Sequence, residues 1–109
     1  MLEDSLNLGV RDAARGSRLA GFLVGSVETN IPIYRATEFG FIHDMWVESA
    51  FRRRGAARLL VEEAVRRFAA MGVRQVRLET AAPNESARRL FAACGFRVGT
   101  IDMLRETGA

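Results

Sequence analysis

The chain has 109 residues, which is enough for one compact domain over its whole length and too few for two ordinary ones. Its 49% hydrophobic and 27% charged residues are typical of a globular protein, and its net charge of +3 comes with arginine as the only basic residue type besides one histidine. One cysteine and one histidine exclude an internal disulfide and argue against a metal centre, and no apolar run reaches the about 20 residues of a membrane helix.

The first segments predict a β-hairpin. Leu6, Leu8 and Val10 alternate with other residues, which is typical of a strand. Residues 12–18 contain a glycine and a serine and indicate a turn. Residues 19–28 are almost continuously apolar, which favours a second strand inside a sheet.

A third strand is expected after a loop. Residues 29–37, with one proline, predict the loop, and residues 38–48 predict the strand. Every second residue of this strand is expected to lie on one face, with Asp44 on the opposite face. The residues expected to share the first face are Phe39, Phe41, His43, Met45 and Val47.

The clearest helix spans residues 56–71 and ends at Gly72. Its apolar residues recur at intervals of three and four, which is the pattern of one buried helical face. They are Ala57, Leu60, Val61, Ala64, Val65, Phe68 and Met71. Residues 73–80 then predict a strand with Val76 and Leu78 pointing inward.

The last elements are a second helix and a final strand. Asn84 follows a proline and precedes a helix over about residues 85–94. Residues 96–104 predict the last strand. A strand, a crossover helix and another strand favour a parallel pair, here added to an antiparallel hairpin. We therefore expect an α/β fold with a mixed antiparallel and parallel sheet flanked by helices.

A turn rich in arginine joins the third strand to the long helix. Residues 48–57 include three consecutive arginines, followed by a glycine and two alanines. A helix N-terminus offers unpaired amides and a positive dipole end, and small residues let an anion approach the backbone. This pattern indicates a phosphate-binding turn, although an exposed basic loop remains the alternative. It is not a Walker loop.

The same turn resembles the signature of the GNAT superfamily of N-acetyltransferases. Arg52, Gly55 and Ala57 match its pattern R/Q-x-x-G-x-G/A. The family's later pattern N-x-x-A-x-x-L-Y-x-x-x-G-F is matched by Asn84, Ala87, Leu90, Phe91, Gly95 and Phe96. The resemblance extends from about Leu19 to Met103 and implies a GNAT-like acetyl-CoA-binding fold.

The resemblance also implies how the co-substrate acetyl-CoA is held. Amides from Arg53 to Arg58 would bind the pyrophosphate, and the backbone of residues 45–47 would pair with pantetheine like an added strand. One of these amides would polarise the thioester carbonyl. The residues so implied are Met45, Trp46, Val47, Arg52, Arg53, Arg54, Gly55, Ala56, Ala57, Arg58, Asn84 and Phe91.

His43 lies nine residues before Arg52, where several small-amine acetyltransferases of the family have a general base. An amine arrives as an ammonium ion, and an imidazole can remove its proton near neutral pH. Glu38 is the reserve base. The alternative for His43 is a strand histidine that only bonds its neighbours.

Two features depart from the family. Phe91 occupies the position of a tyrosine whose hydroxyl protonates the departing thiolate. The chain also looks N-terminally truncated, because family members commonly have a further strand and two helices there. Those helices form one wall of the acceptor site, so a homodimer that supplies the wall is an expectation.

The resemblance therefore predicts a cytoplasmic N-acetyltransferase that acts on a small-molecule or peptide amine by direct attack in a ternary complex, without a metal. The alternative is a non-catalytic acyl-CoA-binding module. A nucleic-acid partner is disfavoured, because the aromatic residues do not interleave with arginines as stacking platforms would. No membrane partner is expected, and the N-terminus is acidic where a secretion signal is basic.

Overall fold

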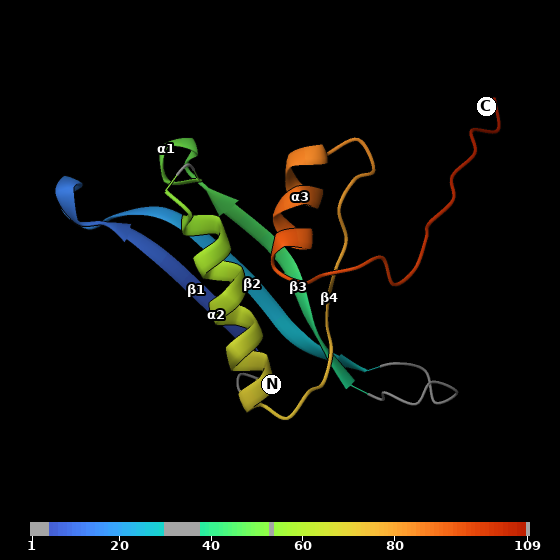
Figure 1. Ribbon diagram of the computed structural model, residues 1–109, viewed down its shortest axis with the longest axis horizontal. Coiled ribbons are helices and arrows are strands. Elements are labelled where there is room, and N and C mark those ends of the chain that lie inside the picture. Colours follow the sequence, from blue (N-terminus) through green and yellow to red (C-terminus); the bar gives the residue numbers. More distant parts are fainter. Residues whose placement is uncertain (1–4, 30–37, 53, 109) are drawn as a thin grey trace.

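A four-stranded mixed sheet forms the centre of the protein (Figure 1). The structure is a computed structural model that describes residues 5–29, 38–52 and 54–108. The strands are β1 (Ser5–Asp12), β2 (Arg18–Thr29), β3 (Glu38–Val47) and β4 (Val76–Leu78), in the spatial order β1-β2-β3-β4. Both pairs that involve β2 are antiparallel, and β3 and β4 are parallel. The predicted hairpin, the parallel pair and the mixed sheet are therefore confirmed.

The helices are α1 (Ser49–Arg52), α2 (Ala56–Ala70) and α3 (Glu85–Ala93), with a 3₁₀ helix at Ala13–Arg15 in the first turn. The predicted loop at 29–37 falls almost entirely on residues outside the described ranges. Within those ranges, no helix is long and apolar enough to cross a membrane.

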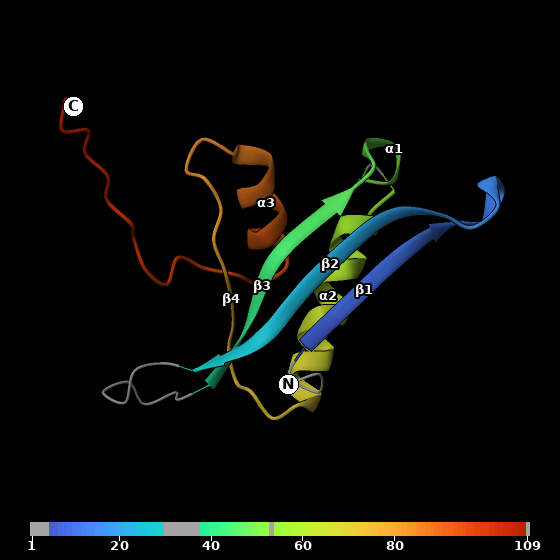
Figure 2. The same cartoon turned by 180° about the vertical axis from the view of Figure 1, so that it is seen from behind.

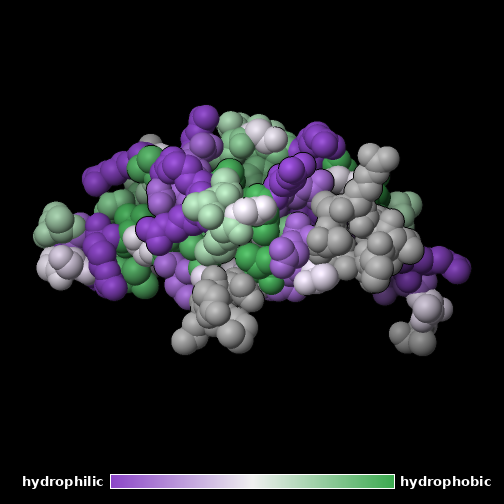
Figure 3. Space-filling view, turned by 90° about the horizontal axis from the view of Figure 1, so that it is seen from below, coloured by the Kyte–Doolittle hydropathy of each residue, from purple (hydrophilic) through white to green (hydrophobic). Residues whose placement is uncertain are grey.

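The core lies between α2 and one face of the sheet. Figures 1 and 2 show α2 across β1, β2 and β3 on one side, and the strands stand in front of α2 when seen from behind. The predicted helical face is confirmed, because Leu60, Val61, Ala64 and Phe68 are buried there. Seen from below, hydrophobic residues remain exposed between hydrophilic ones (Figure 3).

The ring of Phe68 fits against two glycines on neighbouring strands. A Cβ atom on Gly40 would lie 2.5–2.7 Å from carbon atoms of that ring. A Cβ atom on Gly25 would lie 3.1 Å from the ring and 2.6 Å from the carbonyl oxygen of Phe41. These glycines are therefore needed for the close approach of α2 to the sheet.

A β-bulge at His43 changes the faces of the third strand. Val24 pairs with Asp44 and Gly25 pairs with Ile42, which leaves His43 as the extra residue. The expected alternation is therefore wrong beyond Ile42, because the additional residue reverses the faces that follow it. Asp44 pairs with Val24, and His43 contacts Ser26, which lies two residues from Val24 on the same face of β2. Asp44 and His43 therefore share a face and do not lie on opposite ones.

The members of the alternating set separate accordingly. Phe39, Phe41 and His43 lie on the face away from α2, whereas Met45 and Val47 pack with the core. The bulge therefore allows one strand to supply both an exposed imidazole and a buried end next to the turn.

The fourth strand is shorter than the expected 73–80. Only Val76–Leu78 are strand, and they pair with Gly40, Phe41 and Ile42. Val76 and Leu78 pack against the core as predicted. Beyond Ile42, β3 and β4 diverge (Figure 1), since the chain after β4 turns toward α3 and does not continue along β3.

The predicted strand at 96–104 is wrong, because this segment has no regular secondary structure. A strand is stable only when its backbone groups are paired, and the three-residue β4 does not offer a neighbour of sufficient length. The segment runs away from the sheet (Figure 1). Its large apolar side chains are 76–86% exposed, namely Val98, Ile101, Met103 and Leu104.

Candidate functional site

The predicted phosphate turn lies between the end of β3 and the start of α2. This region begins with α1, a single helical turn that the sequence pattern did not indicate. In α1 the carbonyl of Glu48 accepts hydrogen bonds from the amides of Phe51 and Arg52. Gly55 then adopts a left-handed conformation with φ of 80° and directly precedes α2. Most side chains avoid this conformation, so a glycine here is a local backbone requirement.

The backbone around Gly55 is accessible. No atom lies within 4 Å of the position that a Cβ atom would occupy on this glycine. The amide of Leu59 donates to the carbonyl of Gly55, so the amides of Ala56, Ala57 and Arg58 precede the hydrogen-bond ladder of α2. Amides at a helix N-terminus are suited to an anion. Ala56 and Ala57 are buried, and Arg58 is exposed.

Two arginine side chains of the turn, Arg52 and Arg54, have structural partners. Arg52 donates from Nε to the carbonyl oxygen of Val47 over 2.9 Å, which ties the turn to the end of β3. Arg54 stacks over the ring of Phe51, with 5.1 Å between its guanidinium carbon and the ring centroid. Arg53 lies outside the described residues. The side chains of Arg52 and Arg54 thus have contacts within the turn, and the backbone at Gly55 is open to an anion.

An ion pair that no sequence pattern indicated also holds this turn. Arg18 at the start of β2 donates to both carboxylate oxygens of Glu48, over 2.9 and 2.8 Å. The amide of Glu48 donates to the carbonyl of Ala20 over 2.8 Å. A basic residue thirty positions before an acidic one gives no periodic signal, so only the fold brings them together.

The backbone of residues 43–47 has β2 on one side and no β4 partner on the other. This edge is what an extended ligand needs in order to pair like a strand. Within it Val47 is buried, and its carbonyl oxygen is already bonded by Arg52. Trp46 is not a core residue, since it is 46% exposed and its ring lies 6.2 Å from that of Phe22.

Asn84 and Phe91 have local structural roles. Asn84 caps α3, because its Oδ1 accepts from the amide of Ala87 over 3.2 Å. Phe91 is half-buried and meets the ring of Phe96 edge-on at 5.7 Å. Asn84 directly precedes α3 and Phe91 lies within it, and α3 stands beside the part of β3 that has no β4 partner (Figures 1 and 2). Cofactor contacts from either one stay a prediction.

Cys94 at the end of α3 is a half-buried residue that packs against the core. Burial raises the pKa of the Cys94 thiol, and the neighbouring carboxylate of Glu62 raises it further. The thiolate is the nucleophilic form, so a raised pKa makes this thiol a poor acyl carrier at neutral pH.

His43 is part of a polar cluster on the open face of the sheet. Its Nε2 lies 2.6 Å from the hydroxyl oxygen of Ser26 and 3.4 Å from Oε2 of Glu28. Ser26 in turn donates to Oε2 of Glu28 over 2.6 Å. The ring of Phe41 meets the imidazole edge-on at 4.9 Å. His43 is 46% exposed, so solvent and small molecules reach it.

Glu38 is not brought to this cluster. It stands five residues before His43, about 16 Å away along an extended strand. It also lies on the other face, since it alternates with Phe39 and Phe41. No sequence pattern indicated that Ser26 or Glu28 contacts His43. The period of two along β2 would have placed Ser26 and Glu28 on one face, but not next to His43.

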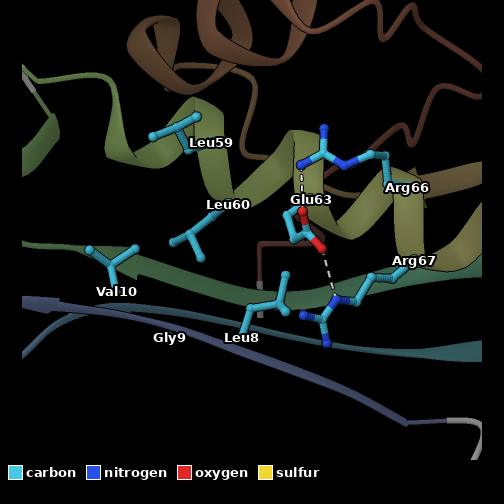
Figure 4. A pocket seen from close by; sticks show the side chains of 8 residues that line it. All are labelled: Leu8, Gly9, Val10, Leu59, Leu60, Glu63, Arg66 and Arg67. Atoms are coloured by element: carbon cyan, nitrogen blue, oxygen red, sulfur yellow. Dashed lines mark hydrogen bonds and ion pairs between the residues drawn. The ribbon is translucent and has the colours of Figure 1, made fainter.

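A further surface feature lies away from this region. A groove of about 290 Å³ lies between β1 and α2 (Figure 4), where Glu63 pairs with both Arg66 and Arg67. None of the predicted site residues lines it. Across the described ranges, no group of histidine, cysteine, aspartate and glutamate side chains could hold a metal ion.

Comparisons with known proteins agree with the fold. A family model described as the acetyltransferase (GNAT) family matches residues 2–96. No curated protein matches the sequence. Similar solved structures include a tetramutant of the BH1408 protein from Bacillus halodurans, with a TM-score of 0.84, 23% identity, and coverage of 95% of this chain and 67% of that one.

Two further similar structures carry named activities. Glucosamine-6-phosphate N-acetyltransferase from Arabidopsis thaliana has a TM-score of 0.77, 21% identity, and coverage of 96% of this chain and 68% of that one. Aminoglycoside N-acetyltransferase AAC(6')-Iy, in complex with CoA, has a TM-score of 0.79, 19% identity, and coverage of 94% and 76%. The chain spans about two thirds of the length of the first structures it matches. Its fold is that of the predicted superfamily.

Proposed function

The chain belongs to the GNAT acetyltransferase family, and on this premise we propose that it is an N-acetyltransferase that transfers the acetyl group of acetyl-CoA to a primary amine. One observation carries the proposal. The open backbone turn at Gly55 lies at the start of α2, directly after the part of β3 that has no β4 partner. An anion-binding turn beside a free strand edge fits a long, phosphorylated and extended molecule.

In this proposal the backbone binds most of the co-substrate. The amides of residues 56–58 receive the pyrophosphate, supported by the left-handed Gly55 and the open space around it. The free edge of residues 45–47 pairs with the pantetheine arm, and the hydrogen bond from Arg52 to the carbonyl of Val47 holds the end of this edge in place. An amide on this edge donates to the thioester carbonyl, where negative charge develops during attack.

His43 acts as the general base of the proposed reaction. Its exposed imidazole removes a proton from the acceptor's ammonium group, and the freed amine attacks the thioester carbonyl carbon. A C–N bond forms, the C–S bond breaks, and the thiolate of CoA leaves. Phe91 has no hydroxyl, so the thiolate leaves as the anion or takes its proton from water. The carboxylate of Glu28 beside His43 favours a cationic acceptor.

A non-catalytic acyl-CoA-binding module is the second candidate. Phe91 in place of a hydroxyl-bearing residue favours it, as does an acceptor side that is open in the described residues. Both candidates require the turn at Gly55. Only the enzyme requires His43, so turnover separates them.

The test is release of CoA from acetyl-CoA in the presence of amines. The panel includes amino sugars and aminoglycosides, because two similar structures are acetyltransferases for glucosamine-6-phosphate and aminoglycosides. Amine-dependent release above the hydrolysis rate without amine supports the enzyme. Binding of acetyl-CoA without release for any amine in the panel supports the module instead.

We also propose that the protein forms a homodimer through residues 97–104. This segment exposes Val98, Ile101, Met103 and Leu104, a concentration of apolar side chains that a second copy would cover. Light scattering is expected to show a dimer for the unmodified chain. A combined Ile101→Lys and Met103→Lys variant is expected to be a monomer, and a monomeric unmodified chain contradicts the proposal.

A further inference from the structure

The contacts of Ser26 determine how protons are arranged around His43. The hydroxyl of Ser26 has a single hydrogen and two close neighbours, Oε2 of Glu28 and Nε2 of His43, each at 2.6 Å. A carboxylate can only accept hydrogen bonds, so the hydroxyl hydrogen goes to Glu28. The oxygen of Ser26 then has only lone pairs to offer to the imidazole.

The imidazole must therefore be the donor in its contact with Ser26. A neutral imidazole carries one proton, and donation to Ser26 requires that proton on Nε2. The lone pair of the neutral ring is then on Nδ1. The carboxylate of Glu28, 3.4 Å from Nε2, favours a proton at this nitrogen by simple attraction.

Among the residues that the structure describes, the contacts of His43 include no competing hydrogen-bond donor. From β3, Phe41 contributes only the edge or face of its ring, and Asp44 follows on the same face of the bulge with a carboxylate. From β2, Ser26 and Glu28 are the polar contacts. The side chains of Ser26 and Glu28 share a face because they are two residues apart on one strand.

We infer that Ser26 and Glu28 are positioning residues that hold the Nε2–H tautomer of His43 and leave Nδ1 as the atom that accepts the proton of the acceptor amine. The catalytic part of this inference rests on the proposed N-acetyltransferase activity, whereas the tautomer does not. Proton transfer is balanced within the cluster. Nδ1 gains the proton that the ammonium loses, and the Nε2–H···Oγ–H···Oε2 chain keeps its own two protons.

The first test is ¹⁵N nuclear magnetic resonance of the imidazole in the unmodified chain. His43 is the only histidine, so its two ring nitrogens are assigned without ambiguity. At a pH that keeps the ring neutral, we expect Nε2 as the protonated nitrogen and Nδ1 as the unprotonated one, with no detectable second tautomer. A spectrum dominated by the Nδ1–H tautomer overturns the inference.

Variants separate positioning from general structural support. Ser26→Ala removes the acceptor and is expected to give a mixture of both tautomers, whereas Ser26→Thr keeps a hydroxyl and the original spectrum. Glu28→Gln provides an amide that can donate to Ser26, which frees the hydroxyl to donate to Nε2 and raises the Nδ1–H fraction. Ser86→Ala, in α3 and bonded to Asn84, is the control that leaves the spectrum unchanged. Identical spectra for the unmodified chain and Ser26→Ala contradict the inference.

Activity provides a second, separate readout. Loss of the fixed imidazole in Ser26→Ala is expected to lower amine-dependent CoA release about 10²-fold while the affinity for acetyl-CoA stays unchanged. A chain that shows the expected tautomer but releases no CoA with any amine contradicts the proposed function alone. A chain that is active but has the Nδ1–H tautomer contradicts this inference alone.

Discussion

Replacement of His43 by alanine is expected to lower amine-dependent release of CoA by about 10²- to 10⁴-fold, the usual contribution of a general base. Without the imidazole, the acceptor remains an ammonium ion, which has no lone pair for attack on the thioester. Initial rates at saturating acetyl-CoA and varied amine measure the effect. His43 is half-exposed on the open face of the sheet, so the thermal unfolding temperature is expected to stay close to that of the unmodified chain.

Glu38→Gln is the matched control for this variant. Glu38 lies on the same strand but on the other face and about 16 Å along it, so its replacement is expected to leave the rate unchanged. A large loss with Glu38→Gln and little loss with His43→Ala would reverse the assignment of the base. Raising the pH is expected to recover part of the His43→Ala rate, because more of the amine is then already neutral.

Replacement of Phe68 by alanine is expected to lower the free energy of unfolding by about 3–5 kcal/mol. The side chain is fully buried between α2 and the two strand glycines Gly25 and Gly40. Those glycines carry no side chains that could move into the space, so a cavity remains. Chemical denaturation monitored through Trp46 measures the change. The loss is a large fraction of the total stability of a domain of this size.

Leu59→Ala is the control on the same helix. Leu59 is 66% exposed, so its truncation is expected to change the free energy of unfolding by less than about 0.5 kcal/mol. Equal effects of Phe68→Ala and Leu59→Ala would contradict the packing of α2 on the sheet. Restoring bulk with Phe68→Leu is expected to recover part of the lost stability, since it fills part of the cavity.

Local periodicity is the reason that most elements could be predicted. The apolar residues of α2 recur at the helical interval, and Gly72 ends the helix where the pattern stops. Asn84 caps the start of α3 by a hydrogen bond from its side chain. Asparagine is a preferred residue at helix N-termini, so its position in the sequence predicts where the helix begins. The small residues around Gly55 predict a turn that a ligand can approach closely, and the left-handed conformation of this glycine agrees.

Features that depend on pairing between distant segments could not be read from the sequence. The bulge at His43 is a one-residue change in register between β2 and β3, and it reverses faces without altering the composition of either strand. The Arg18–Glu48 ion pair and the Ser26–His43 contact also join positions far apart in the chain. Residues 96–104 have the composition of a strand, but a strand forms only where an edge is available to pair with it.

The most direct test of the account is a calorimetric titration of acetyl-CoA into the purified chain and into two variants, Gly55→Val and Gly72→Val. Both glycines have left-handed backbones, with φ of 80° and 90°, and they stand at opposite ends of α2. At each of them, no atom lies within 4 Å of the position that a Cβ atom would occupy. The two variants therefore carry a similar backbone strain, and unfolding of each is measured alongside.

We expect saturable binding by the unmodified chain, equal binding by Gly72→Val, and at least about tenfold weaker binding by Gly55→Val, a loss of about 1.4 kcal/mol. This result supports co-substrate binding at the backbone turn before α2. A folded chain that does not bind acetyl-CoA, or that loses binding equally in both variants, contradicts it.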